Sequence, residues 1–259
     1  MSYASQSYIS YDEYNSFVER VTNTKTLTAY HFTNADFQSM KYKSPIRDLF
    51  ERHVGKIDYM DTLPSTDNQI RNFNRNVDKM KAYNATEFGK LFRLKVGDKG
   101  PGEILLYHAI NDVVLSRTGM DFDASSGSKN VEIKKAIKRQ STKELYNFKI
   151  GNTEKTSSAK YIVDDLLRLA KRNKIIGETT ESISATPMLN LKNNAKKEYN
   201  AIVKGFASVV LEYLKNKVLV AFDDKTGHIV LCTESISADD IGIYEITQGI
   251  IKPTIKYIG

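Results

Sequence analysis

The chain has 259 residues, a formal net charge of +7 and a sequence pI near 9.2. Hydrophobic residues make up 41% of it and charged residues 27%, which is enough apolar material for a folded core and excludes general disorder. The opening residues show no basic stretch followed by an apolar run, and no apolar run reaches roughly 18 residues, so neither secretion nor a membrane partner is expected. The single cysteine, Cys232, excludes an internal disulfide, and four scattered histidines offer no zinc-binding pattern. A cytoplasmic protein is therefore expected.

The positive charge is concentrated in one region. Residues 129–217 hold 19 Lys and Arg against 9 Asp and Glu, a net charge of +10, which leaves 19 basic and 22 acidic residues in the rest of the chain. A localised basic region is typical of proteins that bind a polyanion. Lysine-rich helix faces that only keep a protein soluble would give the same charge, so charge alone leaves both interpretations open.

The first part of the chain is predicted to be mostly helical, with helices over residues 11–21, 45–53, 67–83 and 86–94. The segment VGDKGPG at 96–102 has three glycines and a proline and interrupts this pattern. We therefore expect three regions: a helical N-terminal region over 1–95, a core over 96–235, and a β-rich C-terminal extension over 236–259.

Beyond the glycine-rich segment at 96–102, helices alternate with short β segments. A helix is expected over 103–116, followed by a hairpin centred on the turn sequence ASSGSK and a third strand over 145–150. Further helices are expected over 157–174 and 192–216, the latter with an apolar face that includes Tyr213, and a second hairpin and one or two terminal strands follow. The predicted fold class is α/β of the α+β type, with a mixed sheet.

The first hairpin gathers charged side chains on one face. Because side chains alternate along a strand, Glu132 and Lys134 share a face of the second arm. A turn centred between residues 126 and 127 would place Asp121 opposite Glu132, whereas a register that differs by one pair would bring in Asp123. Opposed carboxylates repel unless a cation lies between them, and Mg²⁺ prefers such oxygen ligands. Glu103, on the apolar side of the preceding helix, adds an inward-facing carboxylate that needs a partner.

This arrangement of Asp121, ten intervening residues and Glu132-Ile133-Lys134, after a helix that carries Glu103, resembles the PD-(D/E)xK nuclease superfamily. The resemblance implies a restriction-endonuclease-like core of helix, three antiparallel strands, helix and strand. It implies that Asp121, Glu132 and Glu103 bind Mg²⁺, with Mn²⁺ as a substitute, and that Lys134 positions the attacking water. The proline of the family motif is absent, and Met120 stands in its place.

The function implied is that of a Mg²⁺-dependent DNA endonuclease, restriction-type or phage-encoded. In that interpretation, DNA phosphates are contacted by a set of mostly basic residues, namely Lys129, Lys135, Lys138, Arg139, Gln140 and Lys143. A homodimer is expected if both strands of a symmetric site are cut. The alternative is a protein of the same fold whose site has lost catalysis and which serves as a DNA-binding or virion structural component.

Overall fold

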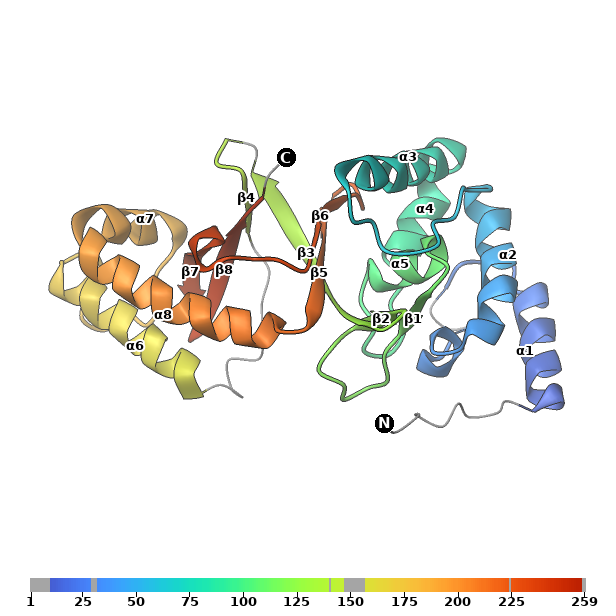
Figure 1. The fold of residues 1–259 in the computed structure, drawn as a ribbon, viewed down its shortest axis with the longest axis horizontal. Helices are drawn as coiled ribbons and strands as arrows, with labels where there is room; N and C mark the ends of the chain where they lie inside the picture. Colours follow the sequence, from blue (N-terminus) through green and yellow to red (C-terminus); the bar gives the residue numbers. More distant parts are fainter. Residues whose placement is uncertain (1–9, 29–31, 140, 147–156, 224, 258–259) are drawn as a thin grey trace. The chain divides into compact units, whose positions relative to one another are not determined.

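The structure is a computed structural model that describes residues 10–28, 32–139, 141–146, 157–223 and 225–257 (Figure 1). The chain divides into two compact units, Met1–Val131 and Glu132–Gly259. Each unit combines helices with antiparallel strands, so the α+β class is confirmed. The region boundaries expected from the sequence, at 95/96 and 235/236, stay predictions. Within the described ranges, no helix is both long and apolar enough to cross a membrane.

Unit 1 is mainly helical. Its helical elements are α1 (Tyr11–Asn23), the 3-10 helices η2 (Asn34–Phe37) and η3 (Met40–Tyr42), α2 (Lys43–Val54), α3 (Asp67–Tyr83), α4 (Ala85–Phe92) and α5 (Glu103–Ala109). Capping boxes begin α1, with Ser10 and Glu13, and α3, with Thr66 and Gln69. The four predicted N-terminal helices are thus confirmed, with ends that differ by a few residues.

The helix predicted over 103–116 is shorter than expected. All seven residues of α5 are buried, and the helix ends at Ala109 because Ile110 is extended. The chain then forms β1 (Val113–Leu115), where β-branched valines suit a strand better than a helix. Lys43 stabilises the change from helix to strand between α5 and β1. Its buried ammonium donates hydrogen bonds to the carbonyls of residues 110, 111 and 113 at 2.5, 3.0 and 2.6 Å.

The predicted hairpin exists, but residues 120–123 do not form its first arm, and of the two registers left open by the sequence it has the one that differs by one pair. Strand β2 (Ala124–Ser126) pairs antiparallel with β1 and with the start of β3 (Lys129–Arg139). Ser126 pairs with Lys129, so the turn is formed by residues 127 and 128 rather than centred between 126 and 127. Gly127 takes a φ of +56°, which suits the first central position of a two-residue hairpin turn and explains the register. Residues 120–123 precede the strand instead of forming it.

The described residues of unit 2 form an antiparallel sheet and three α-helices. Its strands are β3 from Glu132 onward, β4 (Glu144–Tyr146), β5 (Lys217–Asp223), β6 (Ile229–Thr233), β7 (Ile241–Thr247) and β8 (Ile250–Lys256). Strands β3, β4, β8 and β7 are neighbours in that order, and β5 and β6 form a separate hairpin whose strand β5 pairs with β3. The helical elements are α6 (Ser157–Arg172), α7 (Ala185–Asn194), α8 (Lys196–Leu214) and the 3-10 helix η4 (Ala238–Asp240).

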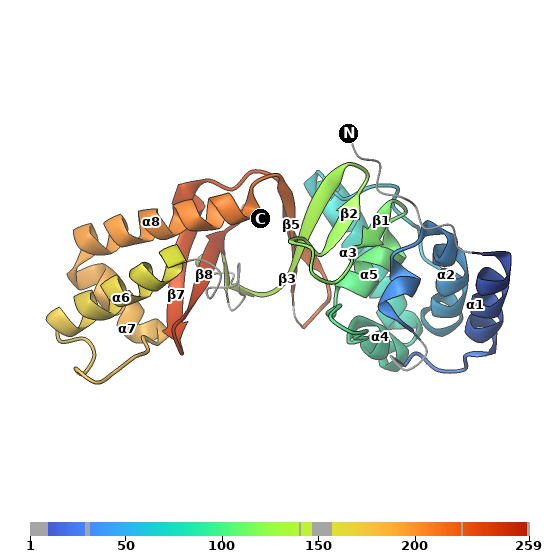
Figure 2. The same cartoon turned by 90° about the horizontal axis from the view of Figure 1, so that it is seen from below.

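Helices α6, α7 and α8 gather beside the β7–β8 hairpin and enclose the apolar core of unit 2 (Figure 2). The helix predicted over 192–216 is in fact two helices, because Ala195, buried between them, takes φ −126° and ψ 45° and interrupts the helix. The predicted hairpin of β5 and β6 is confirmed, and the tail, predicted as one or two strands, forms two strands, β7 and β8, that pair with each other. Strand β4 coincides with the start of the predicted strand over 145–150, and residues 147–150 lie outside the described part of the chain.

Candidate functional site

Glu132 and Lys134 form a buried ion pair on strand β3. The Glu132 side chain is 1% exposed and that of Lys134 is 22% exposed, and the Lys134 ammonium contacts Glu132 Oε1 directly. Residues two apart on a strand project to the same face, which the contact confirms for this pair. A carboxylate this deeply buried is stable only with charged or hydrogen-bonding partners.

Tyr213, near the end of α8, is the second group that holds this carboxylate. Its hydroxyl donates a 2.7 Å hydrogen bond to Glu132 Oε1. The ammonium of Lys217, at the start of β5, lies 4.1 Å from the centre of the Tyr213 ring, and Lys217 is 7% exposed. We call Glu132, Lys134, Tyr213 and Lys217 the Glu132 cluster.

The Glu132 cluster combines one carboxylate, two ammonium groups and a phenol, a formal charge of +1. Such a cluster favours an anion, and a carboxylate held by two donors presents its oxygens in a fixed orientation. The sequence pattern identified Glu132 and Lys134 but treated Tyr213 as an apolar helix residue and did not select Lys217. No sequence signal marks these two, because the contact of Tyr213 with Glu132 and that of Lys217 with Tyr213 depend on how α8 and β5 pack.

Glu103 is buried, as predicted, and belongs to unit 1. It is 8% exposed, stands in the first turn of α5, and accepts a hydrogen bond from the backbone amide of Gly100. A carboxylate at a helix N-terminus is favoured by the free backbone N–H groups there. The partner that a buried acid requires is therefore supplied in part by the chain just before the helix.

The two aspartates of the predicted site also belong to unit 1, in the segment before β2. Asp121 is exposed and Asp123 is half-buried. The Asp123 amide donates a 2.9 Å hydrogen bond to the carbonyl of Val131, so Asp123 continues the hairpin ladder. The structure thus brings Glu132 and Lys134 together within unit 2, while a site that joins them to Asp121, Asp123 or Glu103 stays a prediction.

A metal ion would have to use carboxylate oxygens. Among the residues that the structure describes, no three or more His, Cys, Asp or Glu form a group that could hold a metal ion. Mg²⁺ is commonly held by one or two carboxylates together with water and substrate phosphates, so the oxygen donor of Glu132 fits that ion in kind.

The residues predicted to contact DNA phosphates lie in varied environments. Lys135 is half-buried, and Lys129 and Lys143 are exposed. The Lys138 ammonium lies 4.7 Å from the centre of the Tyr257 ring, and the Arg139 guanidinium packs on two other tyrosines. Gln140 lies outside the described residues.

No protein-family model, curated protein or solved structure matches this chain.

Proposed function

We propose that this chain is a Mg²⁺-dependent DNA endonuclease, restriction-type or phage-encoded, whose core is restriction-endonuclease-like. The observation that supports it best is the buried Glu132–Lys134 pair, which stands on one face of a single strand and is oriented by the Tyr213 hydroxyl. A carboxylate and an ammonium at this spacing are what the resemblance to the nuclease superfamily requires. The positive charge of residues 129–217 supports a nucleic-acid substrate.

Each residue has a defined task in this proposal. Glu132 supplies a fixed carboxylate oxygen, and Tyr213 limits its rotation through the 2.7 Å hydrogen bond. The Lys134 ammonium, adjacent to that oxygen, holds the attacking water and stabilises the negative charge that develops on the phosphate. Bound Mg²⁺ supplies Lewis acidity toward the phosphate and the water. Glu103 and either Asp121 or Asp123 complete the donor set that the resemblance implies.

The test is incubation of supercoiled plasmid with the protein and Mg²⁺. Glu132→Gln and Lys134→Ala should each lower the cleavage rate by about 100-fold or more, since both act on reacting groups. Glu212→Gln is the matched control, because Glu212 is a carboxylate on α8 whose side chain is 75% exposed. Circular dichroism verifies that each variant is folded. Cleavage by both variants at the wild-type rate would contradict the assignment.

One observation favours the alternative, a DNA-binding or virion structural protein that has lost catalysis. Glu132 Oε1 already accepts contacts from Lys134 and Tyr213, so this oxygen is stabilised without a metal ion. Calorimetric titration with Mg²⁺ or Mn²⁺ separates the two functions. A nuclease should bind the ion in the wild type and lose that binding in Glu132→Gln, whereas the alternative predicts the same lack of binding in both.

A further inference from the structure

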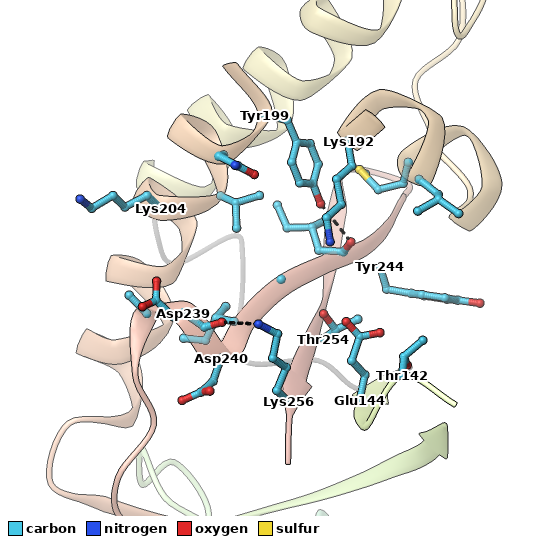
Figure 3. Close-up of a pocket in the computed structure, with 18 of the residues that line it drawn as sticks. Thr142, Glu144, Lys192, Tyr199, Lys204, Asp239, Asp240, Tyr244, Thr254 and Lys256 are labelled. Carbon is cyan, nitrogen blue, oxygen red and sulfur yellow. Dashed lines mark hydrogen bonds between the residues drawn. The ribbon is translucent and has the colours of Figure 1, made fainter. Parts of the chain in front are cut away.

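Unit 2 contains a groove of about 720 Å³ between α7 and α8 on one side and strands β4, β7 and β8 on the other (Figure 3). Apolar side chains form part of its walls, including Met188, Val203 and Ile243. Tyr199 and Lys192 reach into it from the helical side, and Thr254 and Glu144 line the strand side (Figure 3). This volume is in the range of sites that bind small molecules or segments of a polymer.

A cluster of one arginine and two tyrosines stands at the strand side of the groove. The Arg139 guanidinium lies 4.6 Å from the centre of the Tyr146 ring and 5.5 Å from that of Tyr244, and the two rings are 4.8 Å apart. Arg139 and Tyr244 line the groove, and all three side chains are half-buried. Since the rings are already held in place, a flat ligand could stack on them with little further loss of side-chain entropy.

Two lysines on the helical side add positive charge. Lys192 of α7 and Lys204 of α8 are exposed and line the groove. Their positive charge can therefore attract an anion that enters the groove.

The acidic residues at the other end have structural roles. Asp240 accepts hydrogen bonds from the amide and hydroxyl of Ser237, at 3.0 and 2.6 Å, which hold the start of η4 and lower the pKa of this carboxyl. Lys256 donates a 3.0 Å hydrogen bond to the Asp239 carbonyl (Figure 3). A polyanion should therefore run along the end that carries Lys192, away from the carboxylates of Asp239 and Asp240.

We propose that this groove binds a single-stranded segment of the DNA substrate, with a base stacked on Tyr244 and a phosphate at Lys192. The proposal rests on the proposed function, because it names a substrate feature for the same protein. Aromatic rings beside lysines are the combination that single-strand-binding grooves use. In duplex DNA the base faces are covered by neighbouring bases, so only an unpaired segment can use Tyr244 in this way.

Fluorescence anisotropy with a labelled oligo-dT of about 12 nucleotides tests the proposal. EDTA is present, so that no cleavage occurs. Tyr244→Ala should weaken binding by roughly tenfold, and Tyr244→Phe, which keeps the ring, should restore most of it. Lys192→Gln should weaken binding by roughly threefold and reduce the salt dependence by about one phosphate contact.

The matched control is Lys160→Gln, because Lys160 is an exposed lysine on α6 outside the groove. It should bind oligo-dT within a factor of about two of the wild type, since it removes one remote charge. Affinity for a duplex of the same length should not change in Tyr244→Ala. Wild-type affinity in both groove variants, or an equal loss of duplex binding in Tyr244→Ala, would overturn the proposal. Tighter binding of oligo-rU than of oligo-dT would overturn the assignment to DNA.

Failure of this proposal and failure of the proposed function give different results. If the groove binds single strands but the protein is not a nuclease, the Tyr244 and Lys192 variants lose affinity while wild type leaves plasmid intact. If the protein is a nuclease that does not use the groove, plasmid cleavage depends on Glu132, and the groove variants bind oligo-dT as wild type does.

Discussion

Replacing Lys134 with methionine tests whether the Glu132 cluster is a tightly coupled buried unit. The substitution keeps most of the side-chain volume and removes the ammonium that contacts a carboxylate of 1% exposure. Removal of one partner from a buried ion pair costs about 3–5 kcal/mol. Because the Lys134 side chain is 22% exposed, water screens part of the interaction, and we expect a loss near the lower end, about 3 kcal/mol.

The assay is urea unfolding followed by circular dichroism, since the chain has no tryptophan. With an m-value of about 3 kcal/mol/M, the midpoint for unit 2 should fall by about 1 M. Replacing both Glu132 and Lys134 with methionine should cost less than Lys134→Met alone, because the Glu132 carboxylate is then not left buried without its ion-pair partner. Adding Tyr213→Phe should recover about 1–3 kcal/mol more, because it removes the hydroxyl left without its acceptor. A loss under about 0.5 kcal/mol for Lys134→Met, or additive losses in the double variant, would refute this reasoning.

Three further predictions concern two buried titratable side chains and a pair of glycines. Burial, with Arg47 and Lys43 nearby, lowers the pKa of His108 from 6.5 to about 3. The folding stability should therefore fall as the pH drops from about 6.5 toward 3, and His108→Phe should flatten that part of a plot of urea midpoint against pH. Burial lowers the pKa of Lys43 from 10.5 to about 7, so the folding stability should instead rise between about pH 7 and 10. If this rise is absent in Lys43→Met, the rise in the wild type is due to Lys43. A Cβ on Gly242 would lie 2.5 Å from Thr254 Oγ1, so thermal melts should show Gly242→Ala destabilised by about 1–3 kcal/mol. Gly205 lies within α8 with open space around it, so Gly205→Ala should be stabilised by about 0.5–1 kcal/mol.

Local patterns predicted much of the secondary structure correctly. The 3.6-residue apolar period and the capping residues located α3 over Asp67–Tyr83 at the predicted ends. Errors occurred where a distant contact overrides local preference. Residues 110–115 are not helical, because the ammonium of Lys43, which belongs to α2, donates hydrogen bonds to three of their backbone carbonyls. Ala195 interrupts a favourable helical pattern where it is buried in the core.

In the candidate site, too, features set by local geometry were predicted and features set by distant contacts were not. Alternation along a strand was sufficient to place Glu132 and Lys134 on one face, because that geometry depends only on the backbone. The sequence left two hairpin registers open, and the structure has the one that differs by one pair, because the register depends on the φ of Gly127, which the turn sequence alone does not fix. Tyr213 was missed as a partner of Glu132 because it is 81 residues away in the chain.

The amino-acid sequence by itself thus determined the α+β class, the basic region over residues 129–217 and the pairing of Glu132 with Lys134, all of which follow from composition and short-range periodicity. Tertiary structure alone decided how deeply Glu132 is buried, which hydroxyl and which second ammonium complete its cluster, and that Arg139, Tyr244 and Lys192 border one groove. The reason is physical: burial and long-range contacts depend on how separate elements pack, and no local pattern records the partner that a side chain meets.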